Sequence, residues 1–140
     1  MSAKIRKAIL FCSFLVFSSI VFCQKTSSSC VAVFLDDHLV VDEYSEYGQC
    51  IIDYNVTGSF TVQTVILSSE QCQPTGQIKF RLAIRRGASN TLVSFSDNTF
   101  EEVPVEDVLS KCHAGDSILV MLVDEGYTLP HNEIIVHYAQ

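Results

Sequence analysis

Tryptophan is absent from this sequence, and positively charged residues are scarce. The 140 residues contain 9 Lys and Arg against 16 Asp and Glu, a formal net charge of −7. Such an acidic chain repels the phosphate backbone of nucleic acids, so we expect no nucleic-acid partner. Its paired carboxylates lie only where turns and a helix start are expected. Without Trp beside them, they do not indicate a sugar-cleaving cleft.

The sequence motifs of several enzyme classes are missing as well. There is no Gly-x-Ser-x-Gly elbow for a serine hydrolase and no Cys-x-x-Cys spacing for zinc or redox chemistry. Cys112 and His113 are neighbours, but adjacent residues at a helix end point in different directions, and Cys112 belongs to an apolar stripe. We therefore predict a protein that is not an enzyme and needs no cofactor.

The long apolar run at the N-terminus, residues 8–23, has 16 residues against the roughly 20 that a membrane-spanning helix needs. Three basic residues precede it and polar residues 24–29 follow, which is typical of a secretory signal peptide. We predict a signal peptide at 1–23, cleavage before Gln24, and a periplasmic or secreted protein without a membrane span. A retained anchor is the alternative. The mature chain then has 6 basic and 16 acidic residues, a net charge of −10.

Export also changes how the cysteines are interpreted. Two of the 6 Cys leave with the signal peptide, and four remain: Cys30, Cys50, Cys72 and Cys112. An even number in a small exported domain predicts two disulfides, for which three connectivities exist. We favour Cys50 with Cys112 and Cys30 with Cys72. Four buried free thiols are the alternative.

The hydrophobic pattern is that of short β-strands bounded by Gly, Asn, Asp and Ser. Residues 68–76 are predicted to form the longest loop, and residues 124–130 a turn. Pro104, an acidic first turn and an apolar i, i+3, i+4, i+7 stripe predict one short helix over about 104–113. The strands are expected at residues 30–35, 38–44, 50–54, 59–67, 77–86, 91–96, 117–123 and 132–138.

These elements predict a mainly β domain over residues 30–140, preceded by a flexible mature N-terminus at 24–29. Seven to nine short strands with frequent turns are typical of a single immunoglobulin-like antiparallel β-sandwich. Parallel sheets are not expected, because they need crossover helices and only one short helix is available. One core is expected to bury Phe80, Leu82, Ile84, Leu109, Ile118, Val120 and Leu122.

Part of this pattern resembles a known family. The segments "FRLAI", "SFSDNTFEEV", "KCHAGDSI" and "LPHNEIIV" lie between Phe80 and Val136. They are similar to the immunoglobulin-like periplasmic domains near the C-terminus of GldM, the shaft protein of gliding motility and type IX secretion. The resemblance implies the same fold and compartment in a small exported relative of Bacteroidetes type. It does not imply a place in the secretion motor, since the chain has no long helical region.

The C-terminal "HNEIIVH" is a candidate site. As a strand it places His131, Glu133 and His137 on its outward face. Ile134, Val136 and Tyr138 then point to the core. His131 and His137 lie about 20 Å apart in an extended strand, too far for one metal ion to bind both. Lys79, Arg81 and Arg85 likewise share a strand face, which we interpret as a solvated face beside acidic neighbours.

Two hypotheses about function follow. The favoured one is an exported, non-enzymatic β-sandwich that binds a protein or a cell-envelope component through a sheet face or a set of loops. The alternative is a metal-binding protein or metal-dependent enzyme that uses His131, Glu133 and His137, with His38 or Asp37 as a further ligand. Asp36 and Asp37 are expected instead to form a tight turn.

Overall fold

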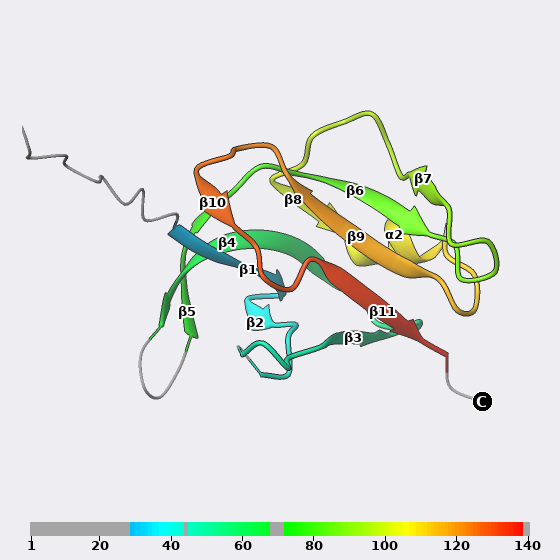
Figure 1. Cartoon of the computed structure of the whole chain (residues 1–140), viewed down its shortest axis with the longest axis horizontal. Helices are drawn as coiled ribbons and strands as arrows, with labels where there is room; N and C mark the ends of the chain where they lie inside the picture. The colour runs from blue at the N-terminus through cyan, green and yellow to red at the C-terminus, as the bar shows by residue number, and fades with distance from the viewer. Residues whose placement is uncertain (1–28, 44, 68–71, 139–140) are drawn as a thin grey trace, which may run out of the picture.

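Figure 1 shows the protein as a computed structural model, which describes residues 29–43, 45–67 and 72–138. Within these ranges the chain forms eleven strands and one short helix. The predicted signal peptide at 1–23 and residues 24–28 of the predicted N-terminal segment lie outside the described residues. The fold is mainly β, as predicted.

The first sheet has six strands. Its main path runs in the order β10-β1-β4-β5, while β2 pairs with β1 and β8 pairs with β4. At its centre, β1 and β4 form an antiparallel pair in register from Val31 opposite Thr64 to Leu35 opposite Phe60. The strands are β1 (Ser29–Leu35), β2 (His38–Leu39), β4 (Ser59–Leu67), β5 (Cys72–Gln77), β8 (Glu102–Pro104) and β10 (Tyr127–Thr128).

The second sheet has five strands in the order β3-β11-β9-β6-β7. β6 and β9 pair antiparallel from Phe80 opposite Leu122 to Arg85 opposite Ser117. Figure 1 shows β9 and β11, the two C-terminal strands of this sheet, side by side. The strands are β3 (Cys50–Asp53), β6 (Phe80–Arg85), β7 (Leu92–Ser94), β9 (Ser117–Leu122) and β11 (Glu133–His137).

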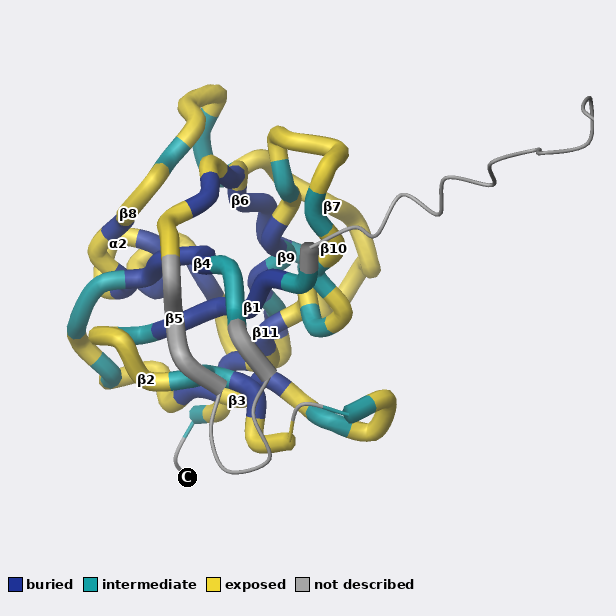
Figure 2. The backbone as a smooth tube through the Cα atoms, turned by 90° about the vertical axis from the view of Figure 1, so that its left-hand side faces the viewer, coloured by how far each residue is buried: buried dark blue, intermediate teal, exposed yellow. Residues whose placement is uncertain are grey.

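One hydrophobic core joins the inner faces of both sheets, and in Figure 2 the buried segments gather at the centre of the domain. The first sheet contributes Val31, Val33, Phe60 and Val62. Six of the seven predicted core residues belong to this core, and the seventh, Leu122, packs against it half-buried. The prediction of a shared core is therefore confirmed. On the opposite face of β1 and β4, four further side chains are buried: Ala32, Phe34, Thr61 and Gln63.

The β1–β2 connection is a two-residue hairpin turn, because Leu35 pairs with His38. Asp36 and Asp37 both have positive φ, 47° and 62°. Two such residues make the turn that matches the twist of a hairpin, and Asp tolerates this conformation. The Asp36 carboxylate accepts a hydrogen bond from the Ser59 amide at 2.9 Å, and a Cβ on Gly58 would collide with it. The predicted tight turn is confirmed.

The helix α2 (Val105–Leu109) is shorter than the predicted 104–113. Pro104 caps it with extended backbone instead of occupying its first turn. After Leu109 the chain continues in tighter turns, with Lys111 N bonded to Val108 O and Cys112 N to Leu109 O. These bonds span three residues and keep Cys112 buried beside the helix.

Three strands were not expected from the sequence. β8 and β10 are only three and two residues long, and β5 contains Pro74 and Gly76, which suggested a loop. Pro is tolerated in β5 because that strand lies at the end of the sheet, where one edge needs no backbone donor. The register also shifts opposite Pro74. Conversely, the strand predicted at residues 38–44 is shorter in the structure, where it is β2 and has two residues.

The expectation of a wholly antiparallel fold is wrong at two pairs. β3 runs parallel to β11, and β1 runs parallel to β10. No crossover helix links either pair directly. Between the two strands of each pair, the chain passes through strands of both sheets. This connection is long enough for the second strand to run in the same direction as the first.

The structure forms no disulfide among the described residues, and the side chain of Cys72 lies outside them. Cys30, Cys50 and Cys112 carry free thiols. β4 lies between β1 and β5, so Cys30 and Cys72 are two strand spacings apart, about 10 Å between Cα atoms. A disulfide needs less than about 7 Å. For Cys50 and Cys112, burial is the main cause that raises each pKa to about 11.

We therefore predict that Cys50 and Cys112 resist alkylation in the folded protein and react only after unfolding. At pH 8 a pKa near 11 leaves about one thiol in a thousand as the reactive thiolate, and burial hinders the reagent further. Iodoacetamide labelling without reductant, read by peptide mass, measures this. If the two cysteines also remain unlabelled in denaturant, they are oxidised and the free-thiol assignment fails.

Candidate functional site

The strand predicted from "HNEIIVH" is β11, and its side chains alternate as expected. Ile134 and Val136 are buried, whereas Glu133, Ile135 and His137 are exposed. Tyr138, just beyond the strand, packs half-buried against the core. The predicted alternation is confirmed.

The exposed ends of β11 are already paired with neighbouring strands. Glu133 accepts hydrogen bonds from the Ser117 hydroxyl at 2.6 Å and from Arg85 Nε at 2.9 Å. The Ser117 bond is the largest cause that lowers the pKa of Glu133; Arg85 adds to it and outweighs the opposing effect of burial. A carboxylate with a lowered pKa is a weak general base. At the other end, His137 Nδ1 lies 3.2 Å from the Asp53 carboxylate.

The other proposed metal ligands lie in different places. His131 and Glu133 line one hollow. In the β1–β2 turn, His38 Nδ1 contacts the Asp36 carbonyl oxygen at 2.8 Å, and Asp37 accepts a hydrogen bond from Gln63. Among the described residues, no three His, Cys, Asp or Glu side chains are arranged to hold one metal ion. The structure thus brings two of the proposed ligands together and separates the others.

Cys112 and His113 do not form a nucleophile–base pair. The Cys112 thiol is buried and donates to the Val108 carbonyl oxygen at 3.5 Å. The His113 ring is exposed, and its Nδ1 lies 2.8 Å from Arg86 NH1. Because a guanidinium only donates, Nδ1 of His113 accepts this hydrogen bond. The two side chains therefore serve different contacts, as the sequence interpretation expected.

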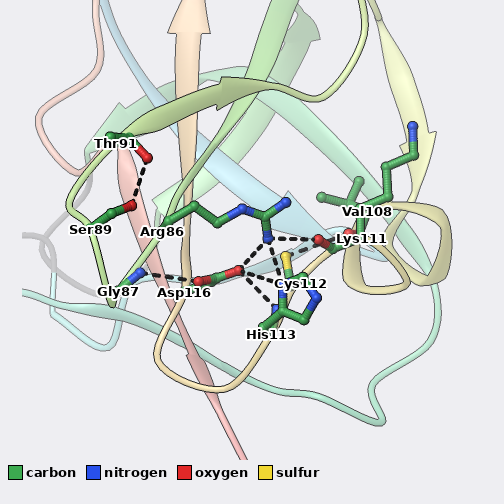
Figure 3. A network of polar contacts seen from close by, with 9 residues as sticks. All are labelled: Arg86, Gly87, Ser89, Thr91, Val108, Lys111, Cys112, His113 and Asp116. Carbon is green, nitrogen blue, oxygen red and sulfur yellow. Dashed lines mark hydrogen bonds and ion pairs between the residues drawn. The ribbon is translucent and has the colours of Figure 1, made fainter.

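A buried carboxylate, Asp116, holds the turns at this end of the second sheet together (Figure 3). Its Oδ2 accepts from Arg86 NH1 at 2.6 Å and from the His113 amide at 2.8 Å, and its Oδ1 accepts from the Gly87 amide at 3.0 Å. Burial alone would raise the pKa of Asp116, but these donors outweigh it and lower the pKa. We call this set of contacts the Asp116 clamp.

The clamp requires two glycines at close approach. A Cβ on Gly87 would lie 2.1 Å from the Gly115 carbonyl oxygen, a distance that backbone atoms cannot accommodate without moving. Gly115 itself has φ of 86°, which favours glycine. The β6–β7 turn and the turn before β9 are thus in direct contact.

The outer face of the second sheet is the side that points away from the core. Five of the eight large apolar side chains exposed in the described chain lie on it: Ile51, Leu92, Met121, Val123 and Ile135. Strand register places several of them next to one another. Ile135 of β11 is opposite Ile51 on one side and opposite Ser117 on the other, and Arg85 is opposite Leu92. Half-buried Leu119 lies between Glu133 and Ala83.

Three of the five Lys and Arg side chains in the described chain also lie on this face: Lys79, Arg81 and Arg85. Arg85 pairs with Glu133. Arg81 makes a long contact of 3.5 Å with the Thr99 hydroxyl, and within the described residues neither Arg81 nor Lys79 has an ion pair. Acidic residues nevertheless lie near Lys79, which lines hollows together with Glu101, Glu102, Asp124 and Glu125.

One end of this face opens into a hollow of about 640 Å³. Residues of β6, β9 and β11 and of the loop before β3 line it, among them Gln49, Arg85, Ser117, His131, Asn132 and Glu133. Its wall is mixed in charge and contains both sides of the Arg85–Glu133 pair. The hollow is thus continuous with the outer face.

Sequence reasoning placed the basic residues of this face but missed its apolar part. The sequence does contain a pattern that predicts these outward apolar residues. β9 is apolar at successive positions, so one set of its side chains, including Met121, must point outward. The Asp116 clamp was not predicted either. In the sequence, "GD" indicates only a turn, and the second turn that contacts it is known only from the structure.

No protein-family model matches the chain, no curated protein is detectably similar to it, and no solved structure matches its fold. Across the described ranges, no helix has the length and apolar character needed to cross a membrane.

We predict that Asp116→Asn lowers the free energy of unfolding at pH 7 by about 3 kcal/mol. The reason is that the substitution puts an amide group, which donates, in place of one oxygen of a buried carboxylate that accepts hydrogen bonds from three donors. The pKa of Asp116 is lower in the folded protein than in the unfolded protein. The contribution of this carboxylate to protein stability is therefore fully present above the unfolded pKa of about 3.9, and it is lost as the pH falls through the folded pKa. Urea titrations at several pH values should therefore show the two proteins converging below about pH 4. A constant difference from pH 7 to pH 3 would rule out the clamp as an ionic interaction.

Proposed function

We propose that this protein is an exported, non-enzymatic binding module, and that it binds a protein or cell-envelope component through the outer face of its second sheet. The observation that carries the proposal is the concentration of exposed aliphatic side chains there, among them Ile51, Ile135 and Met121. Exposed apolar side chains gathered on one face are typical of interaction sites. Export is supported by the signal-like residues 1–23.

The immunoglobulin-like type of sandwich belongs to the same proposal. It is supported by two sheets that share one core and by the resemblance of residues 80–136 to the periplasmic domains of GldM. Immunoglobulin-like sandwiches expose sheet faces and cluster their loops at the two ends, which leaves surfaces on which a partner can bind. We therefore propose an accessory role in the periplasm or outside the cell.

The metal-dependent alternative receives less support. Glu133 is engaged by Arg85 and Ser117, and His137 contacts Asp53 at the far end of the strand. A shared metal site would require both contacts to be given up. The same contacts are compatible with an outer face whose side chains are held in place for binding.

A photo-cross-linking amino acid placed at Met121 tests this function in the native cells. We expect a discrete adduct from Met121, which is 38% exposed on the outer face. The same group at Glu106, exposed on α2, is the matched control and should give none. Protease treatment of the adduct distinguishes a protein from another envelope component. No adduct at Met121, or equal adducts from both positions, would count against the outer face as the binding surface.

A further inference from the structure

We propose that Asn55, in the turn after β3, is a glycosylation site to which an oligosaccharyltransferase attaches an N-linked glycan during or after export. This inference goes beyond the proposed binding function and concerns a different part of the molecule. It is carried by the sequence around Asn55, by the exposure of its turn, and by the contacts of Asn55 and Thr57.

The motif is Asn55-Val56-Thr57, in which a hydroxyl follows the asparagine by two residues and no proline lies between them. This is the acceptor sequence of N-linked glycosylation in exported proteins. The sequence contains four asparagines, and Asn55 alone has Ser or Thr at the second position after it. Bacterial transferases of this class read, in addition, an acidic residue two positions before the asparagine, and Asp53 occupies that position. The motif therefore suits export to a periplasm as well as export through a eukaryotic secretory pathway.

The structure places the motif where a transferase can reach it. β3 ends at Asp53, and the turn that follows is closed by a hydrogen bond from the Val56 amide to the Asp53 carbonyl oxygen at 3.1 Å. Val56 packs half-buried against the core, whereas Asn55 and Thr57 on either side of it are exposed. The core therefore anchors the middle residue, and the two residues that the transferase recognises stay at the surface.

The geometry of the turn does not explain why Asn and Thr stand at these positions. Turns favour Asn because it tolerates positive φ or because its side chain bonds to the nearby backbone. The φ of Asn55 is not positive, and its side chain makes no hydrogen bond to any described residue. The Thr57 hydroxyl makes none within the same residues. Recognition by a transferase accounts for both side chains.

The transfer is a substitution at the anomeric carbon of a glycan carried on a lipid pyrophosphate. The side-chain nitrogen of Asn55 forms a bond to this carbon, and the bond from the carbon to the pyrophosphate oxygen breaks. The electron pair leaves with the lipid pyrophosphate, and one amide proton passes to a base of the transferase. No oxidant or reductant is needed, and the product is a bulky, solubilising group on the turn.

This position is compatible with binding through the outer face of the second sheet. Asp53 pairs with His137, at the end of β11 that extends past Ser117. Met121 lies toward the other end of β9. The glycan and Met121 are therefore at opposite ends of the sheet, and a glycosylated protein keeps the surface around Met121 open.

Peptide mass spectrometry of the protein purified from its native cells tests the proposal. We expect the peptide that contains Asn55 to carry sugar masses, and fragmentation to place them on the Asn55 side chain. Asn55→Gln and Thr57→Ala, expressed in the same cells, should lose the glycan completely, whereas Thr57→Ser keeps the hydroxyl and should retain it. Asn98→Gln is the matched control, because Asn98 is also exposed but has Phe100 at the second position after it, and it should leave the glycan unchanged.

Thermal unfolding of Thr57→Ala confirms that this variant folds, so that a lost glycan reports recognition and not misfolding. An unmodified Asn55 in the protein from native cells would overturn the proposal. A glycan that persists in Thr57→Ala, or one carried by Asn98 instead, would overturn it as well, because the transferase would then not be reading this motif. The Met121 adduct tests the binding function in each of these cases, so the two proposals can fail separately.

Discussion

The buried carboxylate of Asp116 is the constraint on which the second sheet depends. It is the one charged side chain buried in the described part of the chain. An unpaired carboxylate in that position would cost several kcal/mol, so the donors from Arg86, Gly87 and His113 are a condition of folding. Because these donors come from two turns, the carboxylate joins the end of β6 to the start of β9. The approach of Gly87 to Gly115 makes that junction tight enough for the hydrogen bonds.

The residues beside this junction belong to the outer face. Arg85 precedes Arg86, Ser117 follows Asp116, and both contact Glu133 on β11. Fixing Asp116 inside the domain therefore fixes a row of polar groups outside it, next to Ile135 and Leu92. A surface held in this way loses little conformational entropy when a partner binds. The same contacts explain why Glu133 is a poor candidate for catalysis and a good one for a static recognition surface.

The sequence predicted the parts of the fold that depend on local pattern. The alternation of Ile134 and Val136, and the aspartate turn at 36–37, follow from side-chain period and turn chemistry, and both are present. Features set by distant segments were not predictable. β5 is a strand because it pairs with the edge of β4, and the parallel pair of β3 and β11 joins segments from opposite ends of the described chain. The positions of the cysteines also depend on distant segments, since β4 lies between the strands of Cys30 and Cys72. The Asp116 clamp joins residues 29 and 30 positions apart.

The central claim is that the outer face of the second sheet is the working surface of this protein. Amide hydrogen exchange, measured on the protein alone and in the complex purified from its native cells, tests this most directly. Protection gained on binding should fall on residues 80–85, 117–122 and 133–137, with residues 105–109 of the helix unchanged. Protection confined to the first sheet or to the helix would contradict the account.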